Sequence, residues 1–195
     1  MVSRTITAVI LCFAMVIGMT GCKEKSRDKD KAEIEKLVSY YSQALKDYDL
    51  KALYRISTLE EDENFNWRIP SVMDEQKLIG NNGEEKGKWI FEYYKAIAST
   101  ITVDYDLEKI EFSGNTATLK VKYQVVFYAD IAKGVYAGIE SLNKRIKEEK
   151  DVETFDDTIS FMLVDGNWKI VRAKSLIQFI EKFAVHYPRL KAQQT

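Results

Sequence analysis

Few residues of this chain have the types and spacing that catalysis or metal binding requires. His186 is the only histidine, and Cys12 and Cys22 are the only cysteines. Zinc sites take mostly nitrogen and sulfur ligands, of which the chain has too few. The acidic run at 60–63 lacks the spaced oxygen ligands and the turn glycine of a calcium loop. Neither a glycine-rich phosphate loop nor a Gly-x-Ser-x-Gly elbow occurs. We therefore expect no metal, no cofactor and no catalytic residues.

Tyrosines and aspartates on the predicted strands are the remaining candidates. Tyr105 and Tyr123 fall on inward strand faces, where each could supply a phenol. Strand alternation directs Asp104 and Asp106 away from Tyr105, so neither is placed as a base. The competing interpretation is a core tyrosine that reaches one backbone partner. Three further aspartates near strand ends could border a cavity mouth or cap loops: Asp130, Asp156 and Asp157.

The first 22 residues have the pattern of an export signal. Arg4 is the only charge before Lys23, and the run between them is largely apolar. This run is somewhat short of the roughly 20 apolar residues that span a bilayer. It therefore favours a cleaved signal peptide over 1–21. The segment ends in Met19-Thr20-Gly21-Cys22, which resembles the lipobox of bacterial lipoproteins.

The lipobox resemblance implies cleavage before Cys22, a diacylglycerol on its sulfur and an acyl chain on its new amino group. One chain binds a membrane only marginally, so two or three chains make the durable anchor. The chain would then be held at the cell membrane or the outer membrane, with its domain outside the cytoplasm. The alternative is an uncleaved anchor helix with Cys22 as a bystander.

The charge of residues 22–195 limits which classes of partner they can bind. Residues 22–195 carry 28 basic and 30 acidic residues, a net charge of −2. Interleaved signs give no electrostatic footprint for nucleic acid, so we expect no such partner. Residues 23–30 are charged apart from one serine, which predicts a flexible tether over 22–30. Residues 31–195 then form a single domain.

Apolar residues recur at helical spacing in the first half of this domain. One stripe predicts a long first helix: Ile34, Leu37, Val38, Tyr41, Leu45 and Tyr48. Asp49 is placed to cap a short second helix. A short strand is expected at 64–69. Helical turns over 71–80 end at Asn81-Asn82-Gly83, and a firmer helix covers 84–99.

The period changes to alternation after Thr100. A strand over 101–108 passes a bulge near Lys109, and Ser113-Gly114-Asn115 makes a hairpin turn. The clearest strand is 117–129. A last hairpin pairs 155–164 with 168–174, and Ser175 caps a C-terminal helix. The chain is therefore predicted to be α+β, with N-terminal helices packed on a curved antiparallel sheet.

The order of these elements, with the closing run Asp165-Gly166-Asn167-Trp168-Lys169-Ile170, resembles the nuclear transport factor 2-like fold, a cystatin-like α+β cone. That resemblance implies a conical cavity that could take a small apolar ligand. Its expected lining residues are Trp89, Tyr93, Tyr105 and Tyr123. Steroid isomerases of that family pair an aspartate base with a tyrosine that polarises a carbonyl. No acid interrupts the inward face of 117–129, so the base is missing.

Two additions depart from the family pattern, a helical insertion at 131–154 and the C-terminal helix. The insertion carries a narrow apolar stripe: Val135, Ile139, Leu142 and Ile146. Such a stripe must be covered. Either its own domain covers it, over Val126 and Tyr128, or it docks an envelope protein or a second copy of the chain.

These features predict a lipid-anchored binding or protein-interaction module of the cell envelope without catalytic activity. The alternative is a lyase, isomerase or hydrolase that uses the cavity on a small molecule. A buried carboxylate facing Tyr105 or Tyr123 would favour the enzyme. A cavity filled by side chains would count against it.

The lipid anchor can be tested with Cys22→Ser. Serine lacks the thiol that receives the diacylglycerol, so we expect a larger, unprocessed precursor and no mature chain in the detergent phase of a phase-separation extract. Immunoblotting measures both. Cys12→Ser is the control and should be processed normally. A Cys22→Ser chain that matures and partitions like the parent would contradict the assignment.

Overall fold

The computed structural model describes residues 27–58, 72–171 and 189–190. Within these ranges no helix is long and apolar enough to cross a membrane. Several sequence predictions lie outside the described residues: the signal peptide 1–21, Cys22, the acidic run 60–63, the strand at 64–69, and the C-terminal helix from Ser175 with His186.

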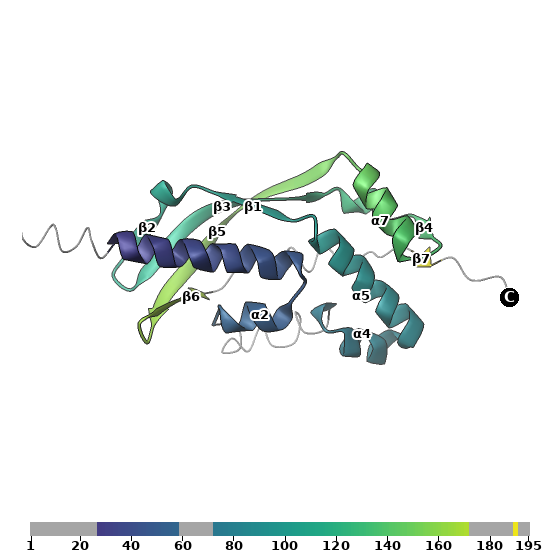
Figure 1. The fold of residues 1–195 in the computed structure, drawn as a ribbon, viewed down its shortest axis with the longest axis horizontal. Coiled ribbons are helices and arrows are strands. Elements are labelled where there is room, and N and C mark those ends of the chain that lie inside the picture. Colours follow the sequence, from purple (N-terminus) through teal and green to yellow (C-terminus); the bar gives the residue numbers. More distant parts are fainter. Residues whose placement is uncertain (1–26, 59–71, 172–188, 191–195) are drawn as a thin grey trace, which may run out of the picture.

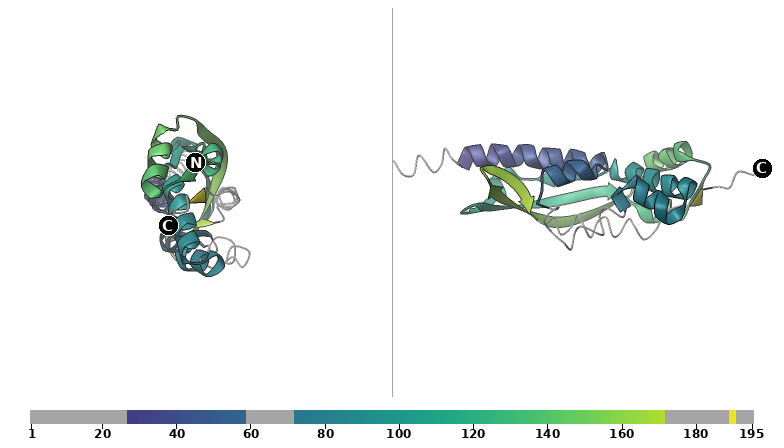
Figure 2. Two further views of the ribbon diagram at one scale, coloured as in Figure 1. Left: turned by 90° about the vertical axis from the view of Figure 1, so that its right-hand side faces the viewer. Right: turned by 90° about the horizontal axis from the view of Figure 1, so that it is seen from below.

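The described chain opens with a helix over residues 27–46, called the first helix here, which lies along one face of the sheet (Figures 1 and 2). The predicted apolar stripe is confirmed, because all six of its residues are buried. Tyr48, the last of them, has a φ of 56° and turns the chain away from the helix. Asp49 then caps α2 (Leu50–Arg55) by accepting a hydrogen bond from the Ala52 amide, as predicted.

The tether prediction differs from the structure at its C-terminal end, because residues 27–30 are helical. The Trp168 Nε1–H donates to Asp30 Oδ1 at 3.1 Å. The Arg27 guanidinium lies 4.4 Å from the centroid of the Phe112 ring. Charge alone predicted solvation here, but each of these two side chains has an aromatic partner supplied by a distant strand.

Two helices that pack on each other, α4 (Glu75–Asn82) and α5 (Glu84–Ala98), follow with Gly83 between them. Asp74 caps α4 through the amides of Gln76 and Lys77. Gly83 has a φ of 86°, a left-handed conformation that suits glycine at a sharp helix end. The helix end predicted at Asn81-Asn82-Gly83 and the helix predicted over 84–99 are both confirmed. Trp89 and Tyr93 are on the buried side of α5.

Five strands form one antiparallel sheet that does not close on itself within the described residues. They are β1 (Thr102–Tyr105), β2 (Glu111–Ser113), β3 (Thr116–Val126), β5 (Val152–Val164) and β6 (Asn167–Val171). Their order is β1-β3-β5-β6, and β2 also pairs with β3. The predicted α+β class is confirmed. A 3-10 turn, η2 (Leu107–Lys109), separates β1 from β2 where a bulge was expected.

The sheet has a buried inner face and a wet outer face. On β3, the alternate residues Ala117, Leu119, Val121, Tyr123 and Val125 are buried, as the alternation predicts. The first helix covers this inner face (Figure 2). Between β5 and β6 the two turn residues Asp165 and Gly166 have φ of 49° and 78°, the pattern of a tight hairpin turn whose twist matches the strands.

The strand predicted at 117–129 is too long. β3 ends at Val126, and Tyr128–Ala132 forms the short helix α6. The alternation of Phe127 and Ala129 continues the strand pattern, but Tyr128 and Ile131 are the buried residues and lie three apart, as in a helix. β4 (Val135–Tyr136) follows and pairs in parallel with β7 (Arg189–Leu190).

The inserted helix is present as α7 (Ile139–Glu148), which packs against α5, α6 and β4. Leu142 and Ile146 are buried by the chain's own residues and Ile139 is half-buried, whereas Val135 is 61% exposed. The predicted stripe is therefore covered mainly within the domain. Its cover includes α5 as well as the region of Tyr128 that the sequence suggested.

A close helix contact gives a stability prediction. A Cβ on Gly87 of α5 would lie 2.4 Å from the Ile79 Cα of α4, whereas a Cβ on Gly80 would meet nothing within 4 Å. Gly87→Ala should therefore lower the free energy of unfolding by about 1–3 kcal/mol through overpacking. Gly80→Ala should raise it by about 0.5–1 kcal/mol through helix propensity. Urea unfolding followed by circular dichroism measures both, and equal effects would contradict the packing described.

Candidate functional site

Two phenols meet at the centre of the inner face. Tyr41 comes from the first helix and Tyr123 from β3, and their hydroxyl oxygens are hydrogen-bonded at 3.0 Å. Both side chains are buried. The Tyr123 ring is also stacked on Phe155 of β5, with centroids 5.1 Å apart. Tyr123 thus has a side-chain partner from the first helix where the sequence suggested a backbone partner.

The surroundings of Tyr41 keep its phenol protonated. Burial raises the pKa of Tyr41 well above its ordinary value, because a phenolate would lose its hydration. The Tyr123 hydroxyl and the Asp157 carboxylate raise this pKa further. At neutral pH the Tyr41 phenol can donate a hydrogen bond, but it cannot act as a base.

Asp157 brings a carboxylate to the inner face. It lies directly opposite Val121 in the β3–β5 register, and paired residues on antiparallel strands point to the same face. Tyr105 pairs with Val121 from β1. Tyr105, Val121 and Asp157 therefore form one row across three strands. Asp157 is half-buried and close enough to Tyr41 to shift its pKa.

The sequence contained a signal for this position that the strand-end interpretation missed. Phe155, Asp157, Ile159 and Phe161 share one parity, and the last two are buried. Asp157 is therefore an acid within an apolar face. Asp104 is on the outer face opposite Lys122, as alternation predicted.

Trp89 and Tyr93, the other two expected cavity residues, are on α5 and not on the sheet. The ring centroids of Trp89 and Tyr136 are 6.4 Å apart, and those of Tyr93 and Tyr94 are 5.5 Å apart. Both are buried in the same continuous core as Tyr123. The Tyr93 hydroxyl is buried without a hydrogen-bond partner among the described residues, and this burial raises its pKa. Of the four residues, only Tyr105 is half-buried.

A second acid, Glu153, also faces inward from β5, opposite Val125. Its carboxylate is close enough to the Tyr128 hydroxyl of α6 to shift the pKa of that phenol. Burial and then the charge of Glu153 raise the pKa of Tyr128 to about 12. Each inward acid of β5 is thus next to a protonated phenol, and neither phenol is a candidate nucleophile.

The outer face carries a depression of about 560 Å³ across β1, β3 and β5. Acids and lysines alternate across its central row, Asp104-Lys122-Asp156. Lys109 pairs with Asp106 at 3.2 Å beside it. Because the signs alternate, this face has no net preference for an anion or a cation, which is typical of a solvated strand face. No group of acids, histidines or cysteines in the described ranges could hold a metal ion.

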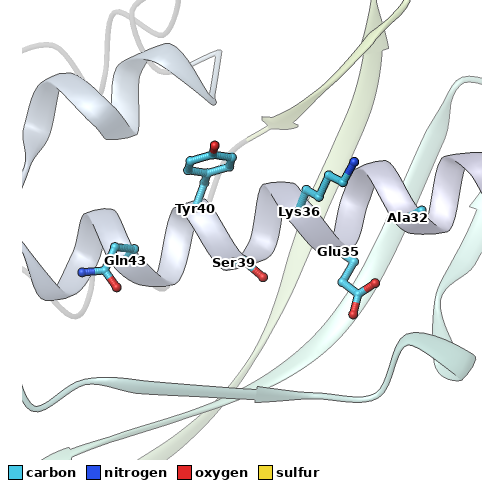
Figure 3. A pocket seen from close by; sticks show the side chains of 6 residues that line it. All are labelled: Ala32, Glu35, Lys36, Ser39, Tyr40 and Gln43. Carbon is cyan, nitrogen blue, oxygen red and sulfur yellow. The ribbon is translucent and has the colours of Figure 1, made fainter.

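The exposed side of the first helix carries a second depression, of about 450 Å³ (Figure 3). Its described lining residues, called the Tyr40 face here, are Ala32, Glu35, Lys36, Ser39, Tyr40 and Gln43. Tyr40 is 70% exposed, more than any other large hydrophobic residue the structure describes. Figure 3 shows Tyr40 and Lys36 rising together from the helix, whereas Ser39 points to the other side.

Comparison with known proteins assigns no relative: no family model matches the chain, and no curated protein matches it.

The phenol pair can be tested by a double-mutant cycle. Tyr123→Phe leaves the buried Tyr41 hydroxyl without its partner, so we expect a loss of about 1–3 kcal/mol in the free energy of unfolding. Adding Tyr41→Phe removes that orphaned hydroxyl. The double variant should therefore be more stable than the sum of the single effects implies. Strictly additive effects in urea unfolding would show that the two hydroxyls do not interact.

Proposed function

We propose that this chain is a lipid-anchored, non-catalytic protein-interaction module of the cell envelope. The anchor is the lipid on Cys22, and the partner is an envelope protein. The domain belongs, in this proposal, to the nuclear transport factor 2-like folds, which is supported by a long helix lying across the inner face of an antiparallel sheet. Fold alone does not determine function, so the proposal depends on the site.

The observation that carries the proposal is the Tyr40 face. Exposed tyrosine is enriched at protein interfaces, where its ring buries a large area while its hydroxyl remains able to bond. Tyr40 lines this depression together with Glu35 and Lys36, whose charges can fix the orientation of a bound partner. The remaining large exposed hydrophobics in the described chain are Val135 and Val152, neither of which lines this depression.

The inner face supports the non-catalytic part of the proposal. Tyr41 and Tyr123 are buried and hydrogen-bonded to each other. Trp89 and Tyr93 are buried in the same core. Buried phenols contribute to packing, and the raised pKa values of Tyr41 and Tyr93 remove these two from acid-base work near neutral pH.

One observation favours the second candidate, an enzyme acting on a small molecule. Asp157 is the half-buried carboxylate in the row that contains Tyr105. In such an enzyme Asp157 would be the base and a phenol would polarise the substrate carbonyl. Asp157→Asn would then abolish turnover while leaving any contact made by the Tyr40 face unchanged.

Site-specific photo-crosslinking tests the proposed interaction. Tyr40 is replaced by benzoylphenylalanine, which keeps a large aromatic side chain, and Lys147 on the exposed side of α7 is replaced as the control. On irradiation of intact cells, we expect an adduct from position 40 and none from position 147. An adduct at twice the chain mass identifies a second copy in place of another envelope protein.

The companion variants are Tyr40→Phe, which keeps the ring, and Tyr40→Glu, which removes it. Benzoylphenylalanine at Ser39 gives the crosslink readout in these two backgrounds. We expect the adduct to persist with Tyr40→Phe and to fall severalfold with Tyr40→Glu. Absence of an adduct from both positions 39 and 40 would refute the proposed face.

A further inference from the structure

We propose that one end of the domain is held against the lipid surface and the opposite end points away from it. This inference depends on the lipid anchor of the proposed function. The membrane-facing end, called the hairpin end here, consists of the first described turn of the first helix, from Arg27, the β2–β3 turn at 114–115 and the β5–β6 turn at 165–166. Figures 1 and 2 show these three segments together, with α4, α5 and α7 at the other end.

Several contacts fix the beginning of the described first helix to the other elements of the hairpin end. Asp30 accepts a hydrogen bond from Trp168 Nε1 at 3.1 Å. Arg27 is stacked over Phe112 of β2, and the Phe112 and Trp168 rings meet edge to face at 5.9 Å. A fourth contact, between Lys31 and Glu108, joins the helix to η2 at 3.0 Å. These contacts tie the first turn of the helix to β2, β6 and η2.

The two hairpin turns are at the same edge of the sheet. β3 and β5 are antiparallel, with Thr116 opposite Met162, so the start of β3 and the end of β5 coincide. The Leu163 amide donates to the Asn115 carbonyl oxygen at 2.8 Å, which links the β2–β3 turn directly to β5. The hairpin end is therefore one continuous surface.

Chain length then limits the distance of this end from the membrane. Only five peptide steps separate Cys22 from Arg27. Even a fully extended chain of five residues spans at most about 18 Å. The first helix runs for 20 residues from that point, or about 30 Å. The tether therefore keeps the hairpin end near the lipid, and the far end of the domain lies a helix length further along.

The sides of the domain, as far as the described residues form them, offer little that would draw it flat onto lipid. The outer face of the sheet alternates acids with lysines and has no basic cluster among the described residues. The large hydrophobics exposed in the described chain, Tyr40, Val135 and Val152, come from separate elements. Such isolated residues do not form the apolar face that interfacial binding requires.

Energy transfer from labelled positions to lipid headgroups tests the orientation. The full-length chain, lipidated in cells, is reconstituted into phosphatidylethanolamine and phosphatidylglycerol vesicles that carry an acceptor dye on a fraction of headgroups. A donor is attached to Asn115→Cys at the hairpin end or, as the matched control, to Glu148→Cys at the end of α7. Both residues are exposed. A long-linker version of each labelled chain carries about 15 additional glycine and serine residues between Lys25 and Ser26. A flexible linker of this length is long enough to let the domain rotate relative to the membrane.

We expect transfer from position 115 to exceed transfer from position 148 by about twofold or more, given a separation on the order of the 30 Å helix. The inserted linker should reduce this difference, because a flexible chain releases the hairpin end from the surface. Equal transfer, greater transfer from position 148, or a difference that the linker leaves unchanged would each overturn the orientation. Failure of the parent chain to float with the vesicles would instead refute the anchor, and the inference with it.

Discussion

Burial of the first helix against the inner face of the sheet is the constraint on which the rest of the structure depends. The apolar stripe of this helix is buried, and its Tyr41 contacts Tyr123 of β3, which comes 82 positions later in the chain. At the centre of this contact, the Tyr41 and Tyr123 hydroxyls must satisfy each other, because burial removes water from both. The bond is directional, so it fixes the position of the helix along β3 more sharply than apolar packing alone does.

Because the first helix is buried on one side only, its two sides have different roles: one packs against the sheet and the other is open to a partner. The inner face uses its phenols to complete the core, and its half-buried acids adjoin protonated tyrosines. The same helix that covers this face presents Ala32, Ser39 and Tyr40 to solvent on its other side. A partner bound there would contact an element that is rigidly seated on the sheet, so binding would require little ordering of the helix.

Local patterns predicted most elements, and long-range contacts account for the differences. Helical spacing and alternation located the buried stripe, α5, β3 and the last hairpin, because each pattern reports which residues face the core. Residues 27–30 look solvated until Trp168 and Phe112 are brought beside them. The end of β3 was missed because its alternation continues into a helix whose burial comes from tertiary packing. Asp157 shows the same limit, since its role depends on Tyr41 and Tyr105 from other elements.

The hydrogen bond between Asp30 and Trp168 joins positions 138 apart in the chain. A chain that emerges N-terminus first presents the first helix long before β3, β5 and β6 exist to cover it. Contacts of such separation form late, because the entropy of closing a long loop must be lost before they contribute stability. The first turns of the first helix therefore cannot be seated on β6 until the strand that carries Trp168 has arrived.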